Sequence, residues 1–206
     1  SSGTKIMNGG TIYYAAKSGY SSVTSTMPMQ SGKWYCELSF PDSLPKSGNH
    51  NYQHIGICPI KSLHTYEGGH GSLYRAKDAL SVDCGSSAYQ ANKGTGSSTT
   101  STNNWNTSYA YDETTYLGIA IDCDNNTVKF YDDGNDLGTF PYSMTAGNSW
   151  VVFVDDWADL GANANDISRT FLNAGQVPFR HAAPSGYKTM CTYNLPDLFS
   201  GDDLNN

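Results

Sequence analysis

The strongest constraint on the fold of this chain is a strict alternation of residue types over positions 33–40, which read Lys-Trp-Tyr-Cys-Glu-Leu-Ser-Phe. Every second residue of this run is apolar, and the apolar set is Trp34, Cys36, Leu38 and Phe40. Because successive side chains of an extended chain point to opposite faces, these four residues share one face. Residues common in turns flank the run on both sides. The pattern therefore predicts a β-strand with one face in a hydrophobic core.

Residues 116–140 have the pattern of consecutive β-hairpins. Apolar residues alternate in the first half, Asp-Asn-Asn at 124–126 favours a turn, and a second alternating run follows. Apolar runs at 54–58 and 150–154 indicate two more strands. Short strands separated by Gly, Pro, Asn and Asp are typical of an all-β sandwich or barrel. Only residues 73–80 have a helical pattern, and it is weak.

Size and charge narrow the class of protein. One large β domain accommodates 206 residues, and we expect an N-terminal arm at 1–8, a sandwich domain at 9–196 and a polar tail or linker at 197–206. A net charge of -7, with basic residues scattered along the chain, argues against a nucleic-acid partner. No apolar stretch approaches the ~20 residues that a transmembrane helix needs, so we expect no membrane span.

The five cysteines are odd in number, widely spaced and without a C-x-x-C pair. This arrangement argues against a metal site of cysteines and against a dense disulfide framework, and it leaves a single disulfide open. Cys36 and Cys123 occupy apolar positions of the expected strands, where we expect buried free thiols. Such thiols indicate a reducing compartment during folding.

Five motifs, in the same order along the chain, resemble those of SPRY domains. They are Ser-Gly-Lys-Trp-Tyr-Cys-Glu at 31–37, Ile-Gly-Ile at 55–57, the hairpin at 117–130, Asp-Leu-Gly-Thr-Phe at 136–140, and the stretch 173–196 with its Asn-Ala-Gly-Gln-Val-Pro-Phe. The resemblance covers nearly the whole chain. It departs from the family pattern at Cys36, where a large aromatic residue is common, and at Ala174, where Phe is usual.

The resemblance carries expectations about fold and function. It implies an all-β, two-layer antiparallel β-sandwich of the concanavalin A-like kind, with ligand binding by loops along one edge and no catalysis. Residues 184–196 are similar to SPRY domains found in phage and other viral structural proteins in particular.

Catalytic sites have weaker signals. Asp122 and Asp124 could share a strand face, as the carboxylate pair of a glycosidase would, but Asp124 opens a turn and the turn interpretation is favoured. His50 and His54 are four residues apart beside a strand, where that spacing does not bring two ligands together, so we expect structural or surface histidines. We therefore expect no catalytic residue and no cofactor.

Two segments, residues 86–112 and 155–168, are expected to be long loops, and loops of this length are usually functional or disordered. Their aromatic residues are the candidate ligand-binding residues: Trp105, Tyr109, Tyr111, Tyr89 and Trp157. Tyr and Trp offer large rigid contact areas at a small entropic cost. Trp105 is the strongest candidate, whereas ordinary packing is an equal alternative for Trp157.

The second segment also contains several oxygen donors of the kind that calcium prefers. Asp155, Asp156 and Asp159 are weak candidates for calcium ligands, together with Asn163, Asn165 and Asp166. The chain lacks an EF-hand pattern, so a solvated loop is the default interpretation.

These observations lead to three functional hypotheses. The first is a non-catalytic module of a phage or viral structural protein (tail fibre, adhesin or capsid attachment) that binds a host-surface glycan or protein, or another virion protein, through aromatic loops. It would be located in the virion, assembled in the host cytoplasm, with a possible homo-oligomer formed through the parent protein. The second is a cellular SPRY adaptor that binds a short peptide, and the third is a polysaccharide hydrolase.

Overall fold

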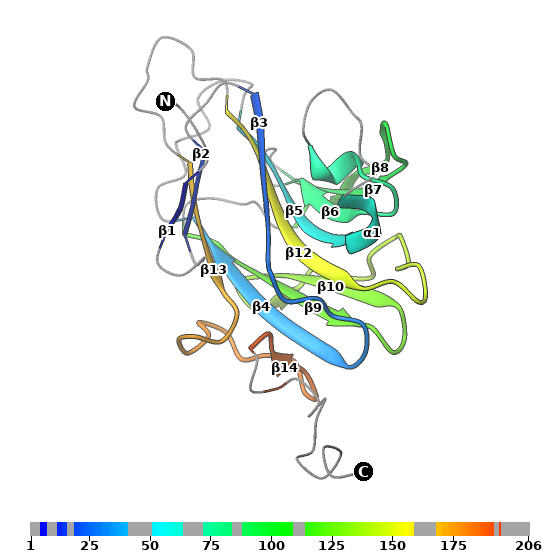
Figure 1. The fold of residues 1–206 in the computed structure, drawn as a ribbon. Coiled ribbons are helices and arrows are strands. Elements are labelled where there is room, and N and C mark those ends of the chain that lie inside the picture. Colours follow the sequence, from blue (N-terminus) through cyan, green and yellow to red (C-terminus); the bar gives the residue numbers. More distant parts are fainter. Residues whose placement is uncertain are drawn as a thin grey trace, which may run out of the picture.

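The structure, a computed structural model, describes residues 5–7, 12–15, 19–40, 51–63, 72–83, 88–108, 114–158, 168–191 and 194. In this part of the chain two antiparallel sheets pack face to face (Figure 1). The hydrophobic core lies between them, as in other β-sandwiches. The all-β, two-layer architecture expected from the sequence is therefore confirmed.

The first sheet has β4 near its centre. In spatial order it contains β1 (Lys5–Met7), β2 (Ile12–Ala15), β13 (Ser168–Asn173), β4 (Lys33–Ser39), β9 (Tyr116–Asp122), β10 (Thr127–Asp132) and β11 (Asn135–Asp136). The short strand β14 (Lys188–Thr189) pairs in parallel with the first half of β4, whereas β13 pairs with its second half. Two C-terminal strands therefore flank β4 on the same side, one after the other.

The second sheet contains β3 (Gly19–Thr24), β12 (Trp150–Ala158), β5 (Asn51–Pro59), β6 (Leu80–Asp83), β7 (Tyr89–Gly94) and β8 (Thr99–Asn106). The short helix α1 (Ile60–Leu63) and the 3-10 turn η2 (Leu73–Arg75) lie between β5 and β6 in the chain. Tyr74 of η2, with Ala76 and Ala79, packs on Phe153 and Cys58 in a small apolar cluster apart from the main core. Among the described residues, no helix is long and apolar enough to cross a membrane.

The core contains the residues that the alternation of positions 33–40 predicts. Trp34, Cys36, Leu38 and Phe40 are each exposed by 4% or less. They pack with apolar residues of β9 and β10 and with those of β5, β6 and β12. Cys36 and Cys123 are buried free thiols, as expected. Each large apolar side chain buried in this way contributes about 1.5–3 kcal/mol.

Two expectations about local structure were wrong. Within residues 86–112, expected to be a loop, β7 and β8 form an antiparallel hairpin. The side chains of β8 are half-buried or exposed and mostly polar, so the strand has no apolar alternation to reveal it. Residues 73–80 form one 3-10 turn and then enter β6 instead of forming a helix.

The outward face of β4 is also buried, which the alternation does not predict. Tyr35 and Glu37 point away from the core, yet they are exposed by only 1% and 2%. Gly118 of β9 makes room for the Tyr35 ring, because a Cβ at Gly118 would lie 2.5 Å from the Tyr35 hydroxyl oxygen. Phe179, Arg180 and His181, from the chain between β13 and β14, contact this face of β4.

Candidate functional site

The segment from 174 to 187, here called the C-terminal segment, is fixed to β4 through the carboxylate of Glu37. One carboxylate oxygen accepts a hydrogen bond from the backbone N–H of Arg180 at 2.7 Å, and the other from that of His181 at 2.8 Å. The Phe179 ring meets the Tyr35 ring edge-on, with centroids 5.0 Å apart. Hydrogen bonds to a charged acceptor are the stronger kind, so the segment has a firm attachment at this point.

The turn that leads from β13 into the C-terminal segment is held by its own polar groups. The Asn173 side chain accepts a hydrogen bond from the Gly175 N–H at 3.0 Å and donates one to the Pro178 carbonyl at 3.3 Å. The Gln176 side chain bridges the Leu172 carbonyl and the Ala174 N–H. Gly175 has φ +107°, a conformation that glycine adopts readily. This turn fixes the position of Val177 and Pro178.

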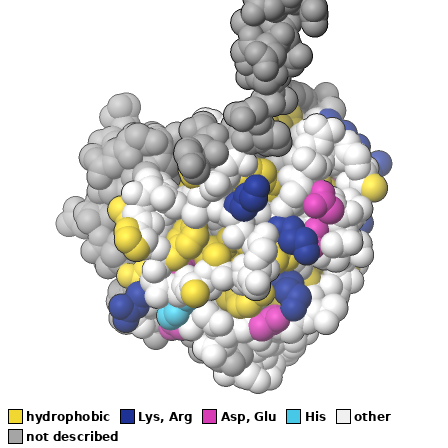
Figure 2. Space-filling model, turned by 90° about the horizontal axis from the view of Figure 1, so that it is seen from below, with side chains coloured by type: hydrophobic (Ala, Val, Ile, Leu, Met, Phe, Trp, Pro, Cys, Tyr) yellow, Lys and Arg dark blue, Asp and Glu magenta, His cyan; other side chains and the backbone are white. Residues whose placement is uncertain are grey.

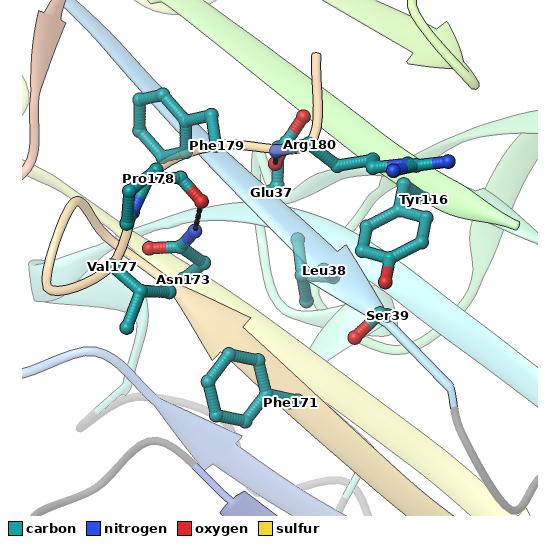
Figure 3. Close-up of a pocket in the computed structure, with 10 residues that line it drawn as sticks. All are labelled: Glu37, Leu38, Ser39, Tyr116, Phe171, Asn173, Val177, Pro178, Phe179 and Arg180. Atoms are coloured by element: carbon teal, nitrogen blue, oxygen red, sulfur yellow. Dashed lines mark hydrogen bonds between the residues drawn. The ribbon is translucent and has the colours of Figure 1, made fainter.

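A pocket of about 380 Å³ lies between the C-terminal segment and the outward face of the first sheet. Its lining residues are Glu37, Leu38, Ser39, Tyr116, Phe171, Asn173, Val177, Pro178, Phe179 and Arg180. Figure 3 shows Val177 and Phe171 on one side of the pocket, and Tyr116 with the Arg180 side chain on the other. Its volume is at the lower end of the ~300–1,000 Å³ typical of ligand sites.

The pocket exposes apolar surface that the fold does not use. Val177 is 48% exposed, and among the described residues it is the one large apolar side chain classed as exposed. Tyr116, Phe171 and Phe179, which also line the pocket, are half-buried. On the face of the molecule that carries β14, apolar side chains likewise lie open among basic and acidic ones (Figure 2). Apolar groups on a rigid concave frame suit a site for a ligand.

Trp105 and Tyr89, two of the candidate aromatic residues of the sequence prediction, do not line this pocket. Trp105 is half-buried on β8, where its indole N–H donates a hydrogen bond to the Thr139 carbonyl at 3.0 Å. Its ring meets the rings of Phe140 and Phe130 edge-on, with centroids 5.3 and 6.4 Å away. Trp105 therefore has a packing role, with part of its surface left open.

The other four aromatic candidates fall into three cases. Tyr89 is 1% exposed and donates a hydrogen bond from its hydroxyl to the Asp132 carboxylate at 2.8 Å, so it belongs to the core and offers no surface to a ligand. The backbone of Trp157 lies in β12, in register with Tyr20 of β3 and Tyr52 of β5. Tyr109 and Tyr111 lie outside the described residues.

The expectation that Asp155 lies in a solvated loop was wrong. Asp155 is in β12 and fully buried, and its carboxylate accepts hydrogen bonds from the Ser22 hydroxyl, from the Ser72 hydroxyl at 3.2 Å and from the Tyr74 N–H at 2.6 Å. Burial raises the pKa of Asp155 to about 7, against the opposing effect of these donors. These hydrogen bonds of the buried carboxylate connect β12 with β3 and with η2.

The remaining calcium candidates add no site to the described structure. Asp156 continues β12 beyond Asp155, and Asp159, Asn163, Asn165 and Asp166 lie outside the described residues. Within the described ranges, no group of three or more His, Cys, Asp or Glu residues could hold a metal ion.

The carboxylate pair considered for catalysis stabilises a turn. Asp122 accepts hydrogen bonds from the backbone and side chain of Asn125 and pairs with Lys33 at 3.1 Å. Asp124 accepts a hydrogen bond from the Gly32 N–H at 2.8 Å. The turn interpretation of Asp124 is therefore confirmed.

His54 has a structural role as well. It is buried, and its ring stacks on that of Tyr74 with centroids 3.7 Å apart. Burial lowers its pKa to about 3, so it is neutral near pH 7. His50 lies outside the described residues.

The pocket residues were missed because residues 173–179 were interpreted only as a motif shared with SPRY domains, with Gly175 and Gln176 as fold residues. That assignment describes Asn173, Gly175 and Gln176 well, since all three shape the turn. A usable signal was the Val-Pro-Phe that follows them, because it places apolar residues in a turn-rich stretch without strand periodicity.

Comparisons with known proteins bear on the fold. No family model matches the sequence, and no curated protein does. Among solved structures, the SPRY domain of human HERC1 is similar with a TM-score of 0.59 and 11% sequence identity, over 85% of this chain and 94% of that domain. A human SPRY domain is similar with a TM-score of 0.55 and 14% identity, over 84% of this chain and 97% of that one. The chain therefore has the two-layer antiparallel fold of SPRY domains.

Proposed function

We propose that this domain is a non-catalytic binding module whose pocket receives an apolar side chain from a partner protein. The observation that carries the proposal is the exposed Val177 among half-buried aromatic rings, on a segment anchored to Glu37. The SPRY-like fold supports it, because the fold supplies a rigid frame for a site on its surface. A partner segment entering the pocket would cover apolar surface that water now contacts.

The pocket suits a peptide better than a glycan. A sugar needs several polar groups free to hydrogen-bond its hydroxyls. The Asn173 side chain is occupied by the turn and the Glu37 carboxylate by two backbone N–H groups, which leaves Ser39, Tyr116 and Arg180 as the other polar side chains of the lining. Val177, Pro178 and Phe171 offer only apolar contact. We therefore propose a peptide ligand. Binding of a glycan, the other ligand considered from the sequence, is an alternative outcome of the binding experiment below.

The aromatic candidates Tyr109, Tyr111 and Trp157 are a further part of the proposal. Tyr109 and Tyr111 precede the pocket residue Tyr116 in the chain, and Trp157 lies near the end of β12. We expect the partner to contact these residues in addition to the pocket. Alanine substitution of Tyr109 and Tyr111 should then weaken binding, whereas unchanged affinity would confine recognition to the pocket.

The parent protein that we propose is a phage or viral structural protein, and the partner another virion protein or a host-surface protein. The support is the similarity of residues 184–196 to SPRY domains of such proteins. A cellular adaptor that binds a short peptide fits the same pocket and is the alternative. Tail or capsid genes beside the gene for this chain would favour the viral assignment, whereas a RING or SOCS-box segment in the same reading frame would favour the adaptor.

The binding proposal is tested with a random peptide library selected against the immobilised domain. Selected peptides should share an apolar residue and bind the wild-type domain but not Val177→Asp, because a carboxylate in the pocket opposes burial of an apolar side chain. Thr100→Asp, which adds the same charge at an exposed site on β8, is the matched control and should bind normally. Equal binding by Val177→Asp, or binding confined to a glycan array, would refute the proposal.

A further inference from the structure

The charge at the edge of the pocket differs in sign from that of the whole chain. The chain carries a net charge of -7, yet the exposed ionic group that lines the pocket is the guanidinium of Arg180. The backbone N–H of Arg180 is bound to Glu37, while its side chain extends away from that bond, on the Tyr116 side of the pocket (Figure 3). Among the described residues, no carboxylate forms an ion pair with this guanidinium.

Two carboxylates in the described part of the chain, Glu37 in the pocket lining and Asp133 next to Tyr116, have other partners. Glu37 is 2% exposed, and both of its oxygens accept backbone hydrogen bonds. Asp133 accepts a hydrogen bond from the Tyr116 N–H at 2.9 Å and lies 3.5 Å from the His181 side chain. Arg180 therefore presents a positive charge to whatever enters the pocket.

We propose that the partner segment is acidic: an apolar side chain occupies the pocket beside Val177, and an aspartate or glutamate next to it pairs with Arg180. This inference rests on the proposed function and adds the chemistry of the ligand. Arginine forms two parallel hydrogen bonds with a carboxylate, which fixes orientation as well as adding affinity. The pocket volume of about 380 Å³ leaves room for one or two side chains, so the carboxylate lies at the pocket edge, where Arg180 is.

The test repeats the peptide selection on Arg180→Gln. Peptides selected by the wild-type domain should carry Asp or Glu beside the apolar residue, and peptides selected by the variant should keep the apolar residue but lose the acidic one. Arg180→Gln should weaken a peptide selected by the wild-type domain about three- to tenfold, because the ion pair is partly exposed to water. Arg180→Lys should retain part of the affinity, since lysine keeps the charge without the two parallel hydrogen bonds.

A double-mutant cycle separates this pairing from a general charge effect. Replacing the acidic residue of the peptide by its amide should weaken binding to the wild-type domain but not to Arg180→Gln. Lys129→Gln is the matched control. It also removes one exposed positive charge, but Lys129 lies on β10 and already pairs with Asp136 at 2.7 Å. It should leave the acidic preference intact.

The outcomes distinguish failure of the inference from failure of the proposed function. Peptides that require Val177 but show no acidic preference, or whose acidic residue matters equally in Arg180→Gln, would overturn the inference and leave the pocket as a binding site. Peptides that bind Val177→Asp as well as wild type would overturn both.

Discussion

Replacing Glu37 by glutamine is expected to release the C-terminal segment from β4. The substitution keeps the shape of the side chain but replaces one carboxylate oxygen by an NH2 group. In the wild-type domain the N–H groups of Arg180 and His181 donate hydrogen bonds to the two carboxylate oxygens at 2.7 and 2.8 Å. The new NH2 group would face one of these two donors. One donor would then lose its acceptor in a site where Glu37 is only 2% exposed, and the remaining hydrogen bond would lose its charged acceptor.

The size of the effect follows from these contacts. A hydrogen bond to a charged group contributes about 1.5–3 kcal/mol, and a buried donor without an acceptor costs a similar amount. We therefore expect a loss of about 3 kcal/mol in the free energy of unfolding, which for a domain of this size lowers Tm by roughly 6–12 °C. The amides of Arg180 and His181 should also exchange with solvent much faster than in the wild-type domain.

Calorimetry and amide hydrogen exchange measure the two effects. Asp124→Asn is the matched control, because Asp124 is an exposed carboxylate that accepts one backbone hydrogen bond, from Gly32 at 2.8 Å. It should cost about 1 kcal/mol or less. Equal losses for the two variants, or unchanged exchange at Arg180 and His181 in Glu37→Gln, would refute the anchoring role of Glu37.

Three other predictions, at Asp155, Gly118 and Trp105, test the frame around the site. The pKa of Asp155 is raised from 3.8 to about 7. Between these two values the folded protein holds a proton that the unfolded chain releases. The free energy of unfolding should therefore fall by up to about 4 kcal/mol as pH rises from 4 to above 7. Urea midpoints at several pH values should show this loss for wild type but not for Asp155→Asn; identical profiles would contradict the assignment. Gly118→Ala should lower the free energy of unfolding by about 1–3 kcal/mol in the same assay, because its Cβ would clash with the Tyr35 hydroxyl. Adding Tyr35→Phe to this variant should recover part of the loss, whereas no recovery would place the strain elsewhere. Trp105→Ala should cost about 2 kcal/mol by loss of packing, and full stability with loss of binding would instead make Trp105 a ligand contact.

Much of the fold could be predicted from the sequence where burial imposes a period on it. Residues 33–40 alternate because one face meets the core, and the hairpin at 116–132 alternates for the same reason. The strand β8 could not be found in this way, because its polar residues lie at a sheet edge and need no alternation. The burial of Tyr35 and Glu37 was hidden too, since residues more than 140 positions away cover them.

The candidate site was harder to predict because exposure is a property of the folded chain. Tyr89 and Trp105 stood in a polar stretch that resembled a binding loop, but Tyr89 is in the core and Trp105 packs on Phe140. Val177 looked like part of a structural motif and is exposed. A single sequence shows which residues could bind, whereas the contacts between distant strands decide which of them face water.

Mapping of a bound peptide by NMR tests the central claim most directly. The tightest peptide selected by the wild-type domain is added to isotopically labelled protein, and the shifts of the backbone amides are followed. We predict that the largest changes lie around the pocket, at Ser39, Tyr116, Val177 and Arg180. Changes concentrated instead around Trp105, or on the outward face of β5 to β7, would contradict the claim that this pocket is the binding site.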